Sequence, residues 1–111
     1  MRRVILESPY TGDTDRNINY ARACVRDSLL RNEAPIASHL LYTQPGILND
    51  SIPEERSLGI DAGLTWAIVA EATVVYCDHG ITSGMEFGIN VAKRVGRQIE
   101  YRLLYDEAPD E

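Results

Sequence analysis

The chain has 111 residues, enough for one domain with a single core, and its 44% hydrophobic and 25% charged residues are typical of a globular protein. Its net charge is −6 and it has a single lysine, Lys93. Proteins that bind polymeric nucleic acid need clustered lysine and arginine residues, so this class of partner is not expected. No stretch approaches the roughly 18 consecutive apolar residues of a membrane helix, and Glu7 follows the basic start too soon for a signal peptide.

The first predicted elements are a strand and a long helix. The apolar run Val4–Leu6 predicts a strand that ends at Ser8–Asp13, a loop rich in turn-forming residues. A helix is predicted from Thr14 to Arg31, with Asp13 or Thr14 as its N-cap. Spacings of three and four residues predict one apolar stripe on this helix, formed by Ile18, Ala21, Val25 and Leu29.

A second strand and a second helix follow. Pro35–Tyr42 predicts a strand that runs into an irregular loop over residues 43–51. Proline and acidic residues at 53–55 suit a helix start, with Ser51 as the expected cap, and this helix is predicted to reach Ala70. Its predicted apolar side comprises Leu58, Ala62, Thr65 or Trp66, and Val69.

The last third of the chain carries the strongest strand signal. Thr73–Cys77 is apolar on both alternating faces, as in a central parallel strand that is covered on two sides. A helix is predicted from Ser83 to Arg94 and ends before Gly96. Gln98–Leu104 alternates between polar and apolar residues, which indicates an edge strand.

Strands that alternate with helices predict right-handed crossovers and a parallel sheet. The expected fold is a flavodoxin-like (Rossmann-like), three-layer α/β domain with four or five parallel strands, formed by residues 1–104 and followed by an acidic tail, 105–111. Ligands bind such sheets beyond the C-terminal ends of the strands, which selects the loops Ser8–Asp13, His39–Ser51 and Asp78–Ser83. The GxGxxG and P-loop patterns are absent, so neither dinucleotide binding of the Rossmann kind nor a Walker-type NTPase is supported.

The segment Asp78–Gly88 holds the densest set of candidate residues. Gly80 and Gly84 permit close backbone approach at a strand-to-helix turn, where the first helical N–H groups attract anions. An ionised Glu86 on that turn can act as a nucleophile or as an electrostatic stabiliser. The structural alternative is a capping box, because Ser83-x-x-Glu86 fits the S-x-x-E pattern.

Four other residues have two interpretations each. Tyr10 either orients a carboxylate or stacks on a base, or is only a partly exposed loop aromatic. Arg16 either holds a phosphate or is a solvated residue of the first helical turn. Asp61 is a surface acid or points into the site, and Trp66 is interpreted as a core residue rather than a stacking platform.

Histidines and cysteines raise the question of a metal site. His39 and His79, with Cys77 and Asp78, supply enough ligand types, but their spacing matches no zinc pattern. We therefore predict no metal, and we interpret Cys24 and Cys77 as small buried thiols in a reducing compartment.

Several of these segments resemble a known family. The strand Val4–Leu6 with the Ser-Pro-Tyr-Thr-Gly loop resembles the first strand and loop of nucleoside 2-deoxyribosyltransferases and the related deoxynucleoside-monophosphate N-glycosidases. Residues 84–92, Gly-Met-Glu-Phe-Gly-Ile-Asn-Val-Ala, resemble their G-x-x-x-E-x-G-x-A helix. Ser38–Leu40 and Pro53–Arg56 resemble small members of that superfamily, many of them from bacteriophages, so the likeness extends over most of the chain.

The resemblance implies cleavage or transfer at the N-glycosidic bond of a (deoxy)nucleoside or nucleoside 5′-monophosphate. It implies that Glu86 attacks the anomeric carbon and that Tyr10 orients its carboxylate. The breaking bond develops oxocarbenium character, which a carboxylate stabilises or captures, while a second acid protonates the departing base. The family has Asp or Ser six residues before the glutamate, where this chain has Gly80, and Asp78 two residues upstream is the expected substitute. The family also has an acid on the preceding helix, near Asp61, so the expected proton donor is Asp61 or Asp78.

The expected substrate-binding residues lie in the three loops and the adjoining helical turns. Backbone and hydroxyl groups of four residues are expected to hold sugar or phosphate: Ser8, Thr82, Ser83 and Gly84. The predicted set is completed by Gly12, Arg16, His39 and Gly80. No metal or organic cofactor is required by this chemistry.

The expected partner is a small nucleoside or nucleotide, with no polymeric nucleic acid and no membrane. The resemblance also implies a homo-oligomer, a dimer or higher, in the cytoplasm of a bacterial or phage-infected host cell. The alternative function is a non-catalytic nucleotide-binding or sequestering protein of the same fold. A third hypothesis is a purely structural assembly protein.

Overall fold

Strands and helices alternate along the chain in the computed structural model, which describes residues 1–105. The elements are β1 (Arg2–Glu7), α1 (Thr14–Leu30), β2 (Glu33–Ile36), the 3-10 helix η1 (Ser38–Leu40), α2 (Pro53–Ala67), β3 (Ala72–Tyr76), α3 (Ser83–Arg94) and β4 (Gln98–Arg102). Apart from Tyr105, the predicted acidic tail lies outside the described residues. No helix within residues 1–105 is both long and apolar enough to cross a membrane.

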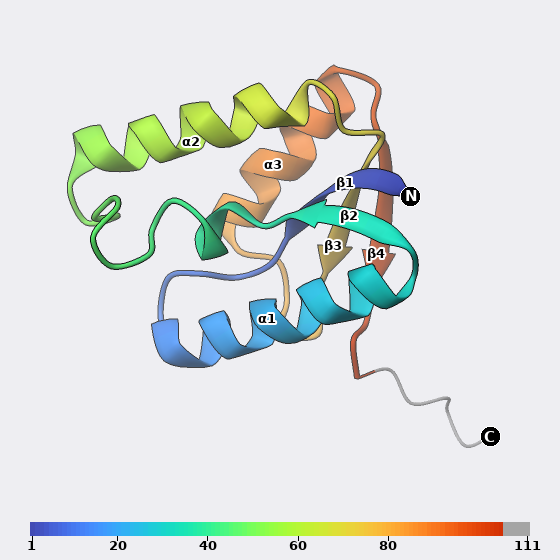
Figure 1. The fold of residues 1–111 in the computed structure, drawn as a ribbon, viewed down its shortest axis with the longest axis horizontal. Helices are drawn as coiled ribbons and strands as arrows, with labels where there is room; N and C mark the ends of the chain where they lie inside the picture. The colour runs from blue at the N-terminus through green and yellow to red at the C-terminus, as the bar shows by residue number, and fades with distance from the viewer. Residues whose placement is uncertain (106–111) are drawn as a thin grey trace.

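The four strands form one parallel sheet in the order β2-β1-β3-β4. All five residues of β3 are buried, as expected for a central strand that is covered on both faces. Figure 1 shows α1 on one side of the sheet and α2 and α3 on the other, which makes three layers. The predicted three-layer parallel fold is therefore confirmed, and β4 is an edge strand as expected.

The side of α1 that faces the sheet is not the predicted stripe. Its buried residues are Asn17, Tyr20, Ala21, Cys24 and Ser28, so only Ala21 belongs to the stripe, and Leu29 is 49% exposed. The polar members are buried because each has a partner. Asn17 Nδ2 donates to the carbonyls of Tyr10 and Thr11, both at 3.0 Å, and the Ser28 hydroxyl donates to Glu33 Oε1 at 2.7 Å. Asp13 caps the helix as predicted, accepting from the Arg16 amide at 3.2 Å.

The second strand is shorter than predicted and begins earlier, at Glu33. It ends at Ile36 because the chain turns into η1, where the Leu40 amide donates to the Ala37 carbonyl at 2.9 Å. Pro35 fits inside β2 because this strand lies at the edge of the sheet, where a missing N–H leaves no partner unsatisfied.

Helix α2 also differs from the prediction. It ends at Ala67, and its cap position is Ile52 rather than Ser51, whose hydroxyl instead donates to Asn49 Oδ1 at 2.7 Å. The predicted apolar side is largely exposed: Leu58 is 59% exposed and Trp66 is 53% exposed, so the interpretation of Trp66 as a core residue is wrong. The small residues Gly59, Gly63 and Ala67 face the rest of the molecule instead.

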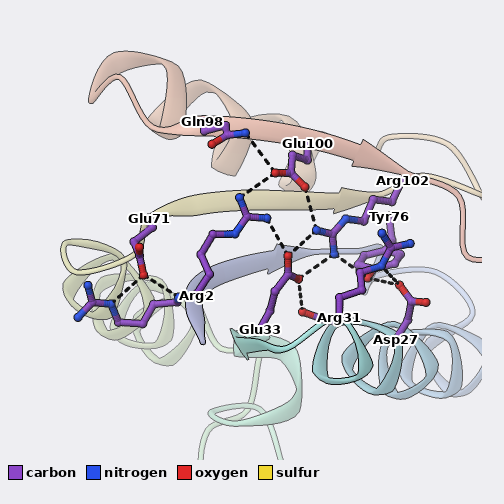
Figure 2. A network of polar contacts seen from close by, with 11 residues as sticks. Arg2, Asp27, Arg31, Glu33, Glu71, Tyr76, Gln98, Glu100 and Arg102 are labelled. Carbon is purple, nitrogen blue, oxygen red and sulfur yellow. Dashed lines mark hydrogen bonds and ion pairs between the residues drawn. The ribbon is translucent and has the colours of Figure 1, made fainter.

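A polar network centred on the buried residues Glu33 and Arg102 connects the two edge strands, β2 and β4, on the face of the sheet that α1 covers (Figure 2). Arg102 on β4 makes a bidentate pair with Glu33 on β2, with distances of 2.9 and 2.7 Å. Arg2 and the Ser28 hydroxyl also donate to Glu33, each at 2.7 Å. These donors, with Arg102 first, lower the pKa of the Glu33 carboxyl to about 2 although burial alone would raise it.

Candidate functional site

A cleft of about 360 Å³ lies between α2 and α3, over the carboxyl end of β1. Its volume is within the range of small-molecule sites, and its position is where open parallel sheets bind ligands. Polar groups reach it from the β1 end, the two following loops, the starts of α2 and α3, and the turn before β4. These residues are Glu7, Tyr10, Thr11, Ser38, His39, Tyr42, Thr43, Asp50, Glu55, Arg56, Thr82, Ser83 and Arg97.

The start of α3 forms one wall of this cleft. Thr82 is the N-cap: its hydroxyl accepts from the Met85 amide at 3.2 Å, and Met85 Sδ accepts from the Thr82 amide at 3.5 Å. The capping box predicted for Ser83 and Glu86 is therefore wrong by one residue. Thr82, Ser83 and Gly84 all line the cleft, so three of the predicted substrate-binding residues lie together.

Glu86 is exposed and does not line the cleft. Successive helical residues are about 100° apart, so each face of α3 takes its own set of positions. Gly84, Phe87, Gly88 and Val91 line the cleft, and Met85, Ile89 and Ala92 are buried against the rest of the domain, with Met85 also reaching the cleft. Glu86 lies on the remaining, solvent-facing side. The structure does not bring it together with Tyr10.

Three acids line the cleft, Glu7, Asp50 and Glu55, and the one at the end of β1, Glu7, was missed by the sequence reasoning. Along β1, Val4 and Leu6 are buried in the core with α1, so the alternate residues Ile5 and Glu7 face the cleft. Burial raises the pKa of Glu7 to about 8, against the opposing positive charge of Arg97. The available signal was an acid at the carboxyl end of an apolar strand, where site residues of parallel sheets are found.

Tyr10 and His39 meet at the cleft as a stacked pair, with ring centroids 4.7 Å apart and planes inclined by 16°. The Tyr10 loop is held by Asn17 of α1, as described above. Burial lowers the pKa of His39 below its usual range, with the charge of Asp50 opposing, so its imidazole is neutral at neutral pH. The two rings form an aromatic stack on the wall of the cleft.

Asp78 is occupied by structural contacts outside the cleft. It accepts from the Tyr20 hydroxyl and from the amides of Leu104 and Tyr105, at 2.8 and 2.9 Å. Burial would raise its pKa, but these donors, with the Tyr20 hydroxyl first, lower it below the usual range. The carboxylate therefore anchors the segment after β4 and is ionised at neutral pH, unlike a proton donor.

The remaining predicted residues are spread over the surface around the cleft. Asp61 is exposed on α2, outside the cleft lining, and Arg16 donates to His79 Nδ1 at 2.8 Å. Gly12 and Gly80 adopt positive φ angles of 102° and 87°, which their turns require. Ser8 is buried, and its hydroxyl is the one buried side-chain polar atom without a partner among the described residues. No group of three or more His, Cys, Asp or Glu residues suited to a metal ion occurs within residues 1–105.

Comparisons with known proteins agree with the architecture. Residues 2–102 match a family model described as "Domain of unknown function (DUF7768)". A solved 2-deoxyribosyltransferase from the psychrotolerant bacterium Bacillus psychrosaccharolyticus, described as a biocatalyst for nucleoside synthesis, is similar to this chain with a TM-score of 0.65 and 15% identity. The match covers 97% of this chain and 77% of that chain, and it supports the predicted fold relationship. A search of the curated proteins found no match.

Proposed function

We propose, for a chain that belongs to the family described as "Domain of unknown function (DUF7768)", an enzymatic activity at the N-glycosidic bond of a (deoxy)nucleoside or nucleoside 5′-monophosphate. One observation carries the proposal: the cleft at the carboxyl end of β1 combines a helix N-terminus, an aromatic surface and a carboxyl group in a fold shared with a 2-deoxyribosyltransferase. The helix N-terminus suits the sugar or phosphate, the aromatic rings suit the base, and the carboxyl group suits the glycosidic bond between sugar and base.

The first turn of α3 suits the sugar or its 5′-phosphate. Helix N-termini carry free N–H groups and a partial positive charge, so they attract anions. Thr82 and Ser83 add hydroxyl groups, and Gly84 leaves the backbone open to close approach, because an added Cβ would meet no atom closer than 4.0 Å. In this proposal the stacked Tyr10 and His39 rings contact the base.

The carboxyl groups of the cleft supply the chemistry. Cleavage of the C1′–N bond develops positive charge on the sugar, which nearby carboxylates stabilise or capture. Glu7, Asp50 and Glu55 line the cleft, whereas Glu86, the nucleophile that the resemblance implies, lies outside it. Replacing Glu86 with glutamine tests its part directly: loss of base release assigns the nucleophile to Glu86, and unchanged release assigns the chemistry to the cleft carboxylates.

The test of the activity is incubation with a panel of deoxynucleosides and monophosphates, with and without an acceptor base, followed by chromatography of the bases. Free base without acceptor indicates hydrolysis, and a new nucleoside formed only with acceptor indicates transfer. If no compound is turned over and none raises the melting temperature, nucleotide binding itself is refuted. Light scattering of the same sample tests the homo-oligomer, which stays a prediction.

The second candidate function is a non-catalytic nucleotide-binding or sequestering protein. It is favoured by the exposed positions of Glu86 and Asp61 and by the structural contacts of Asp78, since all three expected catalytic acids lie outside the cleft. This candidate predicts a rise in melting temperature with a nucleotide but no release of base over long incubation.

A further inference from the structure

Glu7 fits against α3 because residue 88 has no side chain. A Cβ added at Gly88 would overlap the Glu7 carboxyl, with Oε1 at 3.0 Å and the remaining carboxyl atoms closer. Within residues 1–105, an added Cβ at any other glycine would meet no carboxyl group. The end of β1 therefore packs against α3 at a position where the Glu7 carboxyl has room to reach into the cleft.

The Glu7 carboxyl also differs from the other acids of the cleft in lacking a donor. Asp50 pairs with Arg56 at 3.3 Å, and Glu55 Oε1 accepts from the Asn49 amide at 2.6 Å. Among the described residues, none donates a hydrogen bond to the Glu7 carboxyl. Glu7 is half-buried, and a carboxyl that is partly removed from water and receives no hydrogen bond favours its protonated form.

The charged groups around Glu7 do not prevent its carboxyl from staying protonated. Arg97, whose positive charge opposes the protonation of Glu7, donates from its guanidinium to the Ala67 carbonyl at 3.0 Å and to the Thr73 hydroxyl at 3.2 Å. From the first loops the cleft receives Tyr10, Tyr42 and the neutral His39. From the α2 side it receives Asp50, Glu55 and Arg56.

We propose that Glu7 is the general acid of the cleft, whose carboxyl O–H protonates the departing base as the N-glycosidic bond breaks. This inference rests on the proposed function, and it assigns to Glu7 the role expected of Asp61 or Asp78. Neither of those residues lines the cleft, and the Asp78 carboxylate is already held by two backbone amides.

In the hydrolytic reaction, water is the co-reactant. The C1′–N bond breaks with its electron pair on the base, and the Glu7 proton moves to a ring nitrogen of that base, which leaves a Glu7 carboxylate. The oxygen of a water molecule then bonds to C1′, and the released water proton returns to Glu7. In the transfer reaction, a ring N–H of the acceptor base takes the place of water.

The test compares Glu7→Gln with wild type on two kinds of substrate. Ordinary deoxynucleosides need a proton on the leaving base, whereas N7-methylated purine deoxynucleosides already carry the positive charge and leave as neutral bases. Loss of a general acid costs about 10²–10⁴-fold in rate. We expect Glu7→Gln to lose that factor on the ordinary substrates and less than about tenfold on the methylated ones, since only the former need the acid.

Glu54→Gln is the matched control, because Glu54 is an exposed acid on the first turn of α2 outside the cleft lining. Gly88→Ala, which displaces the Glu7 carboxyl without removing it, is expected to show a smaller loss with the same substrate preference. Equal losses on both substrates, or full activity of Glu7→Gln on ordinary deoxynucleosides, overturn the acid role alone. A wild-type protein that releases no base from any substrate overturns the proposed function and this role with it.

Discussion

The titration of Glu7 links the cleft to the stability of the whole domain. In the unfolded chain this carboxyl ionises with its ordinary pKa of 4.5, whereas burial raises the pKa to about 8 in the folded protein. Between these values the folded state binds one more proton than the unfolded state. The free energy of unfolding therefore falls by about 1.4 kcal/mol per pH unit as the pH rises from 4.5 to 8, and is level above that.

The full shift corresponds to about 5 kcal/mol at pH 8 and above. Water in the open cleft screens the carboxylate, so we expect somewhat less than half of this value, about 2 kcal/mol. Glu7→Gln keeps the shape of the side chain but cannot ionise. The variant should therefore match wild type near pH 5 and exceed its stability by about 2 kcal/mol at pH 8.

Urea unfolding followed by circular dichroism, at half-unit steps from pH 5 to 9, measures this difference. Glu54→Gln serves again as the control and is expected to follow wild type within about 0.5 kcal/mol. A difference between wild type and Glu7→Gln that does not change with pH would refute the reasoning. So would a variant that is less stable than wild type at pH 8. The measurement needs no substrate and is independent of the proposed activity.

Three further predictions concern the network and the α3 cap. Arg102→Met leaves Glu33 buried without its bidentate partner and should destabilise the fold by about 3–5 kcal/mol in urea unfolding; a loss below about 1 kcal/mol would show the pair to be unimportant. Since the folded pKa of Glu33 is lowered to about 2, its contribution is present above pH 4.5 and is lost as the pH falls toward 2. The stability gap between wild type and Glu33→Gln should thus shrink by about 3 kcal/mol over that interval, and a constant gap contradicts this. Thr82→Ala should cost about 1 kcal/mol and Ser83→Ala less than about 0.5 kcal/mol in thermal unfolding, and the reverse order would return the cap to Ser83.

The amino-acid sequence by itself determined the elements and their parallel arrangement. The apolar strand around Val74 and Val75, buried on both faces, and the alternation with helices leave few alternatives to a covered parallel sheet. Ser83–Arg94 was predicted with its observed bounds, because glycines and apolar spacing mark that helix locally. The loops that flank the cleft followed from the same rule, since ligands bind parallel sheets beyond the strand ends.

Only the tertiary structure decided which face of each helix points inward. Helical spacing defines a face but not its partner, so α1 buries Asn17 and Ser28, whose hydrogen-bond acceptors come from other segments. On α2, Trp66 is left outside because small residues make the contact.

The positions of Glu7 and Glu86 relative to the cleft were likewise decided by the tertiary structure. The spacing around Glu86 indicated a functional helix start, but a rotation of about 100° per residue turns Glu86 to solvent and Gly88 to the cleft. Glu7 enters the space that Gly88 leaves open, from a strand 81 positions earlier in the chain. A carboxyl group that reaches the site through contact between two distant segments leaves no local pattern in the sequence. Only the packing of the folded chain could therefore reveal it.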